Sequence, residues 1–443
     1  MREKQMLRWP TVPPPGTVRE WGLLLVGPGL VMAATGVGAG DLVTAAVNGA
    51  RFGLGLLWII VVGAALKFVL CEGIARWQLE TGTTLMEGWC QRLHPAIRYL
   101  FLGYLVLWAF FVSGGLASVS GLAGHALVPI GETAATSVVR WGVIHMVVGG
   151  ALVYFGRYAL FEKVMAVLVG VMFLCTLTGA VLTAPDWMKV LKGAFVPVTL
   201  PEGCGPYILS AIGGVGGSVT MLSYSYWLIE ARRNGREWRR ATRVDLAVCY
   251  ITTAVFGLCL MIMASQVLYP APDVTAKRDL LIQLAGALRD RVGEGGYWLF
   301  VLGLWGGVFS SVIGVLNGIP YLFSHLVAMI REVPERDQQA YLAATSVWYR
   351  GFLLFLVFPP LVLLVVQKPL VAAVLYTILA SLITPFIAAT LLYMNNRRAW
   401  MGKAVYGKVV NIILVVVLAL FLFLLATEIQ EQVNRLFFSG GGG

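Results

Sequence analysis

Residues 35–41 read Thr-Gly-Val-Gly-Ala-Gly-Asp and residues 213–218 read Gly-Gly-Val-Gly-Gly-Ser, so two distant parts of the chain carry nearly the same phrase. They stand inside the first and the sixth apolar stretches that are long enough to cross a bilayer. Glycine costs about 1 kcal/mol in a helix interior relative to alanine, so both glycine runs predict an unwound segment. In lipid, unwound backbone is tolerated only where it is buried in protein or lines a cavity. A matched pair of broken helices in the two halves of a membrane protein indicates the substrate site of a transporter.

The composition of the chain is that of an integral membrane protein. Of its 443 residues, 58% are hydrophobic and 12% are charged, whereas a soluble domain carries about 25% charged residues. Apolar runs of about 20 residues predict an all-α protein with eleven transmembrane helices. The predicted spans are residues 22–50, 54–79, 98–128, 138–156, 159–184, 205–231, 243–268, 296–329, 350–366, 369–394 and 405–428.

The distribution of lysine and arginine predicts the orientation. With the N-terminus inside, 22 of these 33 residues fall on the inner side, ten fall on the outer side, and Lys67 falls within a span. Inner loops are the basic ones in membrane proteins, so we expect a multi-pass protein of the cell (inner or plasma) membrane with a cytoplasmic N-terminus and an outside C-terminus. The net charge of +11 is then a topology signal. Because its arginines are spread over six inner segments, we expect no nucleic-acid partner.

Breaks in the first and sixth of eleven spans predict a 5+5 inverted repeat with one extra helix. An odd number of spans in each half turns the second half upside down relative to the first. The predicted organisation is a cytosolic N-terminal arm (residues 1–20), the first repeat (21–184), an outer loop (185–204), the second repeat (205–395), the eleventh helix (396–430) and a C-terminal tail (431–443). Residues 273–291 are predicted to form a short helix on the outer surface, from leucines at helical spacing: Leu280, Leu281, Leu284 and Leu288.

Six cysteines and four histidines are dispersed along the chain. They form no CxxC, HxxxH or HExxH spacing, so the sequence predicts neither a disulfide framework nor a zinc enzyme. Catalytic constellations and nucleotide-binding motifs are also missing from the sequence. We therefore expect no enzyme activity and no cofactor, and a transport process that is secondary-active or uncoupled.

Short motifs stand at the ends of several predicted spans. Residues 26–30 (Val-Gly-Pro-Gly-Leu) lie at the entry into helix 1 and residues 74–82 (Ile-Ala-Arg-Trp-Gln-Leu-Glu-Thr-Gly) at the exit from helix 2. Residues 385–387 (Pro-Phe-Ile) and 395–402 (Asn-Asn-Arg-Arg-Ala-Trp-Met-Gly) lie at the ending of helix 10. These motifs, with Lys192, Gly193 and Pro197 by position, resemble the natural resistance-associated macrophage protein (Nramp) family of proton-coupled divalent-metal transporters. The resemblance covers most of the chain and implies a leucine-transporter-type fold with an alternating-access mode of transport.

The resemblance carries over only part of the family's metal site. The family has Asp-Pro-Gly-Asn in the break of helix 1, where this chain reads Gly38-Ala39-Gly40-Asp41, so a carboxylate stands where asparagine is expected. The Met-Pro-His-Asn signature of helix 6 has no counterpart. Its sulfur-ligand position falls on Thr220 or Met221, depending on a one-residue slip, and the glutamine of helix 10 falls on Thr377.

The candidate site is rich in oxygen donors. Asp41 is the first expected ligand, because a carboxylate at mid-membrane is costly unless it is functional or paired. Free carbonyls and hydroxyls around it favour a hard cation, and Met221 is an optional soft ligand. The candidate metal ligands are Asp41, Thr220 and Met221, and the candidate substrate-binding residues are Gly38, Asp41, Thr44, Gly217, Ser218, Thr220, Met221, Ser223 and Thr377. The alternative is that both glycine runs are GxxxG helix-packing motifs.

A second set of polar residues is expected in the coupling-ion or proton pathway: Lys67, Glu72, Ser310, Ser311 and Asn317. Lys67 in helix 2 pairs with Asp41 or Glu72, attracts an anionic substrate group, or carries the proton; a pair with Asp41 would compete with a metal. By resemblance to the broader leucine-transporter-type fold, the helix 8 residues help to form a sodium site. Ordinary helix–helix hydrogen bonds are the alternative.

Near the second break, Tyr224, Tyr226 and Trp227 gate a pocket or form a lipid belt. The arginine run after helix 6 marks topology, and Asp245 is a candidate partner for it.

Two functions remain open from the sequence. The first is an Nramp-like importer of a hard divalent cation, Mg²⁺ or Mn²⁺, working by alternating access as a symporter of protons or sodium, or without coupling. The second keeps the fold and carries a small anion such as bicarbonate, or an amino acid, with sodium as a candidate coupling ion. In that case Lys67 and the N-termini of the half-helices hold the negative group. The expected partners are a small inorganic ion or solute and the lipid bilayer, with no obligate protein partner.

Overall fold

A computed structural model describes residues 11–17, 27–37, 39–196, 204–271, 279–365 and 369–437. Within these ranges all regular structure is helical. Seven segments are long and apolar enough to cross a membrane. Together with two broken pairs of half-helices and with α18 and α20, they make the eleven expected spans. The predicted all-α membrane fold is confirmed.

The half-helices and the long helices have the following bounds: α2 (Pro28–Gly36), α3 (Ala39–Phe52), α4 (Trp58–Thr81), α6 (Ala96–Leu127), α7 (Ala134–Phe155), α8 (Tyr158–Leu182), α10 (Gly205–Gly214), α11 (Thr220–Glu230), α12 (Arg239–Val267), α14 (Glu294–Ile330), α16 (Val347–Val357), α18 (Pro369–Met394) and α20 (Lys408–Phe437). Short helices connect them: α5 (Leu85–Arg92), α9 (Trp187–Phe195), α13 (Asp279–Val292), α15 (Glu335–Leu342), α17 (Val362–Val365) and α19 (Arg398–Met401). Single 3-10 turns are η1 (Arg236–Trp238), η2 (Pro359–Leu361) and η3 (Gly402–Ala404).

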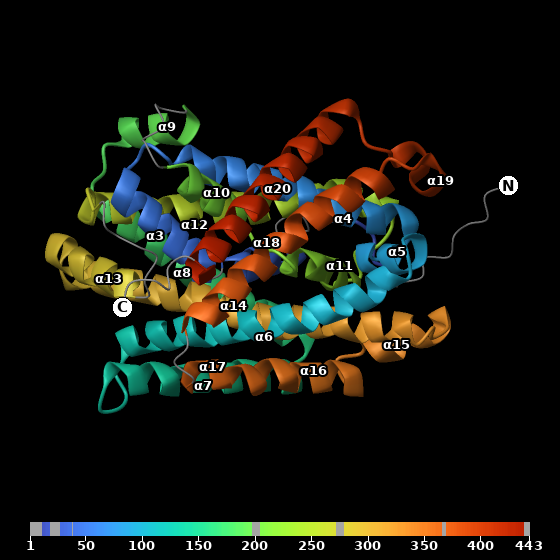
Figure 1. Cartoon of the computed structure of the whole chain (residues 1–443), viewed down its shortest axis with the longest axis horizontal. Coiled ribbons are helices and arrows are strands. Elements are labelled where there is room, and N and C mark those ends of the chain that lie inside the picture. The colour runs from blue at the N-terminus through green and yellow to red at the C-terminus, as the bar shows by residue number, and fades with distance from the viewer. Residues whose placement is uncertain are drawn as a thin grey trace.

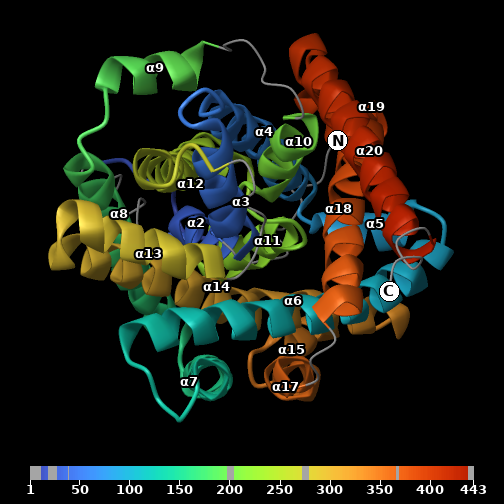
Figure 2. The same ribbon diagram turned by 60° about the vertical axis from the view of Figure 1, so that its left-hand side comes forward.

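The long helices lie side by side along one direction, and Figure 1 shows α5, α15 and α19 at one end of the bundle and α9 and α13 at the other. We call these the α5 end and the α13 end. Helix α14 is the central support, because it packs against α2, α6, α8, α11 and α16. Figure 2 shows the half-helices α2, α3, α10 and α11 in the middle of the bundle. Peripheral helices expose large apolar side chains such as Phe155 and Val409, as lipid-facing helices do.

Of the short helices, α13 was predicted from the sequence, whereas α5 and α9 were not. The predicted outer segment forms α13, whose four leucines are all buried; it begins at Asp279, and residues 272–278 lie outside the described ranges. Helices α5 and α9 were not predicted, although each begins with a capping side chain. Thr84 accepts a hydrogen bond from the main-chain N–H of Glu87 at 3.2 Å, and Asp186 accepts one from Met188 at 3.0 Å.

The described part of the N-terminal arm, residues 11–17, is tied to the loop that follows α11. The main-chain N–H of Val12 donates to the carbonyl of Arg232 at 2.9 Å, and the Trp238 indole donates to the carbonyl of Val12 at 2.7 Å. The Thr11 hydroxyl donates to the carbonyl of Asn234 at 2.7 Å. The arm is thus held to the bundle by hydrogen bonds that sequence reasoning did not predict.

We predict that a side chain at Gly49 destabilises the bundle, because a Cβ there overlaps the main-chain carbonyl oxygen of Met261 in α12. Overpacking of this kind costs about 1–3 kcal/mol. Gly49→Ala should therefore lower the melting temperature of the purified protein. Gly170→Ala in α8 is the control, since a Cβ at Gly170 meets nothing within 4 Å. Equal melting temperatures for the two variants would contradict the packing of α3 on α12.

Candidate functional site

The first span is broken directly after Gly36. Helix α2 ends there, Val37 has φ −79° and ψ 74°, and α3 begins at Ala39. Gly38, which was predicted to bind substrate, lies outside the described residues. The predicted interruption of the first span is therefore found between Gly36 and Ala39.

The sixth span is broken between Gly214, the last residue of α10, and Thr220, the first residue of α11. Gly216 and Gly217 have φ of +76° and +85°. This left-handed region is open to glycine and costly for residues with a Cβ, so the glycines permit the break directly. The unwinding that the glycine run predicts is found at these positions.

The two breaks touch each other. A Cβ on Gly36 would lie 3.1 Å from the carbonyl carbon of Gly216, and a Cβ on Gly217 would lie 3.7 Å from the Cα of Gly36. Residues that are about 180 apart in sequence thus pack backbone to backbone, as small residues allow between membrane helices. The glycines serve both interpretations raised by the sequence, because they break the helices and also pack them closely.

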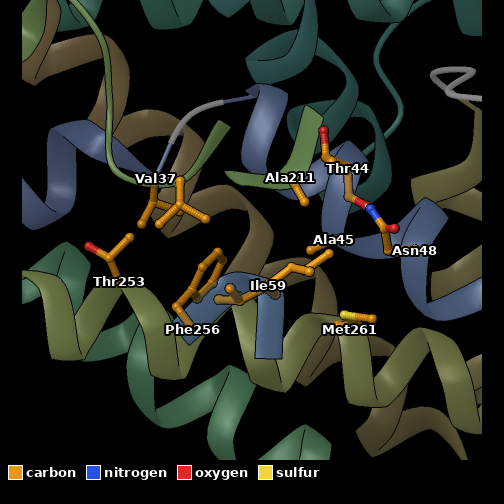
Figure 3. Close-up of a pocket in the computed structure, with 12 residues that line it drawn as sticks. Val37, Thr44, Ala45, Asn48, Ile59, Ala211, Thr253, Phe256 and Met261 are labelled. Carbon is orange, nitrogen blue, oxygen red and sulfur yellow. The ribbon is translucent and has the colours of Figure 1, made fainter. Parts of the chain in front are cut away.

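A small cavity lies beside the first break, among α3, α4, α10 and α12. Its volume is about 20 Å³, enough for one water molecule, which needs roughly 10–15 Å³. Figure 3 shows Thr44 and Asn48 at one end of this cavity and Val37 and Thr253 at the other. Asn48 is fully buried; its Nδ2 donates to the carbonyl of Thr44 at 2.9 Å, and its Oδ1 has no hydrogen-bond partner within the ranges that the structure describes. Thr44, which was predicted to bind substrate, therefore lines a cavity beside the amide oxygen of Asn48, which the described residues leave unsatisfied.

The predicted ligands in α11 are buried next to the second break. The side chains of Thr220, Met221 and Ser223 are 4%, 0% and 0% exposed, while Ser218 is only partly buried. The hydroxyls of Thr220 and Ser223 have no hydrogen-bond partner among the described residues. A Cβ on Gly217 would overlap the Thr220 hydroxyl, which therefore lies against the unwound backbone. Buried hydroxyls without a partner call for water, an ion or a ligand.

Two predicted residues have side chains that lie outside the described set. Asp41 is the third residue of α3, so its main chain follows the first break directly. Thr377 lies within α18. Among the side chains that the structure describes, no three His, Cys, Asp or Glu residues gather as a metal site.

Lys67 reaches the second break from α4. Its ammonium donates a hydrogen bond to the carbonyl oxygen of Gly217 at 2.6 Å, and the side chain is fully buried. The same ammonium lies 5.4 Å from the ring centre of Phe421 in α20. A buried positive charge thus rests on a carbonyl group that the break releases.

Glu72 lies five residues after Lys67 in α4 and forms no ion pair with it, so the predicted pair of Lys67 with Glu72 was wrong. Its carboxylate forms ion pairs with Arg76 at 2.7 Å and with Arg243 at 2.8 Å. Guanidinium groups offer several donors in a fork that matches a carboxylate, so two arginines satisfy it more fully than one ammonium does. Glu72 lies in an arginine cluster between α4 and α12.

Ser310 and Ser311, the two serines of α14, lie against the first break. The Ser310 hydroxyl donates to the carbonyl of Ala34 at 3.0 Å, and the Ser311 hydroxyl lies 2.5 Å from the carbonyl of Val37. The carbonyl of Ala34 belongs to the last turn of α2 and that of Val37 follows the helix directly, so neither has a hydrogen-bond partner within α2. The serines therefore hold α2 to α14 at the position predicted for a coupling ion.

Asn317 is placed differently from the serines. Its Oδ1 accepts a hydrogen bond from the Trp227 indole at 2.9 Å, and its carbonyl accepts one from Tyr349 at 3.0 Å. It therefore links α14 to α11 and α16, in the manner of ordinary helix–helix hydrogen bonds. Tyr224, Tyr226 and Trp227 are at most 1% exposed, so the lipid-belt interpretation of these aromatic residues was wrong.

The beginning of α2 is fixed by Asp245 of α12. One carboxylate oxygen accepts hydrogen bonds from the Gly29 main-chain N–H and from the Tyr224 hydroxyl, both at 2.8 Å. The other oxygen lies 3.7 Å from the guanidinium of Arg233, which confirms the predicted partnership with the arginine run. A carboxylate at a helix N-terminus also has a favourable interaction with the helix dipole. Both ends of α2 are thus anchored to other helices.

Comparisons with known proteins agree with this architecture. The family described as natural resistance-associated macrophage protein-like, Nramp, matches residues 29–430. The divalent metal cation transporter MntH of Acidiphilium cryptum is 25% identical over 397 residues, which cover 86% of this chain and 84% of the relative. The MntH protein of Chromohalobacter salexigens is 23% identical over 424 residues, which cover 89% of each chain.

Among solved structures, a mutant form of the Eremococcus coleocola manganese transporter is similar in fold. Its TM-score is 0.77 at 18% identity, and the superposition covers 98% of this chain and 92% of that one. The family match extends over nearly the whole sequence and includes both breaks. The chain therefore belongs to the Nramp family of multi-pass membrane transporters.

Proposed function

We propose that this chain imports a hard divalent cation, Mg²⁺ or Mn²⁺, by alternating access, through a site at the two contacting breaks. The observation that carries the proposal is the contact of Gly36 with Gly216, together with the buried hydroxyls of Thr220 and Ser223, which find no hydrogen-bond partner in the described part of the chain. Unwound backbone and open hydroxyls together offer oxygen ligands within the membrane. Relatives named as divalent metal cation and manganese transporters support this cargo.

The proposed metal ligands are Asp41, Thr220 and Met221, with carbonyl groups of the breaks completing the shell. One carboxylate is few for a dehydrated divalent ion, but Mg²⁺ keeps several waters and binds through one or two carboxylates. Hydroxyl, carbonyl and carboxylate oxygens favour Mg²⁺ and Mn²⁺ over softer metals. The remaining proposed substrate-binding residues are Gly38, Thr44, Gly217, Ser218, Ser223 and Thr377.

Lys67 sets a condition on this site. Its ammonium already occupies the Gly217 carbonyl, so a cation that binds this oxygen must displace it or find it deprotonated. Loss of the lysine proton removes the repulsion and weakens the hydrogen bond to the Gly217 carbonyl, because a neutral amine is a poorer donor than an ammonium. We therefore assign Lys67 to the coupling of cation entry with proton release, which is one form of proton-coupled transport.

Sodium coupling at α14 has less support than coupling to protons. The hydroxyls of Ser310 and Ser311 donate to carbonyls at the end of α2 that a sodium ion would have to bind instead.

For the orientation, the basic inner loops support a cytoplasmic α5 end, with the N-terminus inside and the C-terminus outside. The positions of the two broken spans also support the inverted 5+5 repeat, because α2 begins the first half of the bundle and α10 begins the second.

A second candidate cargo is a small anion or an amino acid. The specific observation in its favour is the same buried ammonium of Lys67 at the second break, since a positive charge there would attract a carboxylate or bicarbonate. The half-helix N-termini would add to this attraction.

A ligand panel separates the two cargos. We expect Mg²⁺ and Mn²⁺ to raise the melting temperature of the purified protein, because a ligand at 100 times its Kd adds about 2.7 kcal/mol of stability. Ca²⁺, Na⁺, bicarbonate and amino acids are measured in parallel by thermal shift and calorimetry. If only the anionic or organic solutes stabilise the protein, the metal proposal is wrong and the second cargo is favoured.

Replacing Asp41 tests the proposed carboxylate ligand. Asp41→Asn keeps the shape of the side chain but removes its charge, so we expect Mn²⁺ affinity to fall about tenfold or more, equivalent to about 1.4 kcal/mol. Asp337→Asn on the exposed helix α15 is the control, and calorimetry gives the affinities. Unchanged Mn²⁺ binding and uptake in a folded Asp41→Asn protein would remove Asp41 from the site.

Replacing Lys67 gives opposite results for the two cargos. Lys67→Met keeps the length of the side chain and removes the ammonium, so Mn²⁺ should bind several-fold more tightly and with less dependence on pH. Lys189→Met is the control, because Lys189 is exposed and its described ion pair is with the nearby Asp186 at 3.6 Å. Loss of binding of an anionic solute, with no gain in Mn²⁺ affinity, would support the second cargo instead.

A further inference from the structure

A line of polar side chains runs along the contact between α11 and α14, away from the second break. Thr220, Ser223 and Tyr226 stand three residues apart on α11 and therefore lie on one side of it. Ser223 lies against α14, since a Cβ on Gly318 would be 2.7 Å from its side chain. Tyr226 meets α14 at His325. We call Thr220, Ser223 and Tyr226 with His325 and Glu87 the polar seam.

The seam ends in a buried carboxylate and a buried imidazole. His325 of α14 and Glu87 of α5 both have 0% exposed side chains, and their Nε2 and Oε2 atoms are 4.0 Å apart. The other imidazole nitrogen, Nδ1, is 3.0 Å from the Tyr226 hydroxyl. The other carboxylate oxygen accepts a hydrogen bond from Gln91 at 2.9 Å. The pair thus joins α5, α11 and α14 at the α5 end.

We propose that Glu87 and His325 form a proton-binding pair that receives the transported proton after it leaves the broken segments. The proposal rests on the proposed cation import and names where its coupled proton is held. One proton enters the pair from the seam, bound as a carboxylic acid beside a neutral imidazole or as an imidazolium beside a carboxylate. The same proton leaves to water at the α5 end, so the pair returns to its starting state.

Burial explains why such a pair would hold a proton. Without it, the carboxylate and neutral imidazole together carry a net negative charge in an apolar interior, which is costly. With one proton the pair is neutral as a whole. Movement of α11 would change the contact of Tyr226 with His325 and admit water, which favours the charged form. The proton affinity of the pair then depends on the conformation of α11. This dependence couples proton binding to the conformational change of transport.

Several titratable groups near the pair have other partners. Among those on or next to the elements packed around α5 and α14 are Glu80, Cys90, Arg98, Glu230, Glu332 and Tyr349. Glu80 pairs with Arg236 at 2.8 Å, and Arg98 pairs with Glu332 at 3.5 Å. Glu230 accepts a hydrogen bond from Tyr321 at 2.8 Å. The carboxylates among them are thus already held by a basic group or a hydroxyl.

The chain supplies matched controls for both members of the pair. His145 of α7 is also a buried membrane histidine, but its Nε2 accepts a hydrogen bond from the Trp305 indole at 3.0 Å and its ring stacks on Trp141. Glu230 is the control carboxylate, since its described hydrogen bond is to Tyr321. Substitutions at His145 and Glu230 change the same residue types at positions whose described hydrogen bonds are to Trp305 and Tyr321 and not to Glu87 or His325.

The first experiment measures proton binding without transport. The chain has only four histidines, so isotope-labelled histidine in the purified protein allows the imidazole signals to be followed by NMR from about pH 5 to about pH 9. We expect Glu87→Gln to lower the midpoint of the His325 titration by about one pH unit or more, because the imidazolium loses its anionic neighbour. Glu230→Gln should leave it unchanged. An identical His325 titration in wild type and Glu87→Gln would overturn the pair.

The second experiment measures coupling in proteoliposomes, with Mn²⁺ as the probe and a pH-sensitive dye inside. Glu87→Gln and His325→Gln should lose Mn²⁺-driven proton movement and keep Mn²⁺ uptake down its own gradient, whereas His145→Gln keeps both. Tyr226→Phe, which removes one hydroxyl, should slow the proton movement if the larger changes impair folding. Wild-type proton movement in Glu87→Gln, or in Tyr226→Phe where Glu87→Gln does not fold, would contradict the proposal. Wild-type protein that moves no Mn²⁺ would overturn the proposed function, while the NMR titration still decides on the pair.

Discussion

Backbone groups that an unwound helix releases within a bilayer find no water there, so the protein itself must satisfy them. In this chain the carbonyls at the end of α2 are bound by serine hydroxyls from α14, and the Gly217 carbonyl is bound by the ammonium of Lys67 from α4. These contacts explain why α14 lies at the centre of the bundle and why a lysine is kept deep in a membrane protein. In the proposed function the same oxygen atoms bind the transported cation. The internal donors and the proposed cargo would then compete for one set of acceptors.

The breaks and the spans could be predicted because they depend on local chemistry. Runs of glycine lower helix stability wherever they occur, and apolar stretches of the right length enter the membrane regardless of their neighbours. The leucine spacing of α13 belongs to the same class. Contacts between distant residues could not be read in this way. Lys67 meets Gly217 across 150 residues, and Ser310 meets Ala34 across 276, so the partners depend on how helices pack. For the same reason the arginine partners of Glu72 and the meeting of Glu87 with His325 were missed.

This chain departs from the family's metal-site motifs at both breaks. Where the family places an Asp-Pro-Gly-Asn sequence, this chain has glycines followed by Asp41. In the sixth span, α11 has hydroxyl groups and Met221 instead of the family's histidine. We infer a site with fewer fixed charges, whose occupancy depends on whether the nearby ammonium of Lys67 stays protonated. The buried pair of Glu87 and His325 would then hold the proton at a distance from the metal. A metal site and a proton site that are separate in space can be altered separately by mutation.

The central claim is that the two contacting breaks form a cation site. The most direct measurement is anomalous X-ray diffraction at the manganese absorption edge, from crystals grown with Mn²⁺. The account predicts an anomalous peak between the two breaks, within coordination distance of the Gly217 carbonyl and the Thr220 hydroxyl, with Lys67 moved away from that carbonyl. No peak there, with the Lys67 ammonium still on the Gly217 carbonyl in the presence of saturating Mn²⁺, would contradict it.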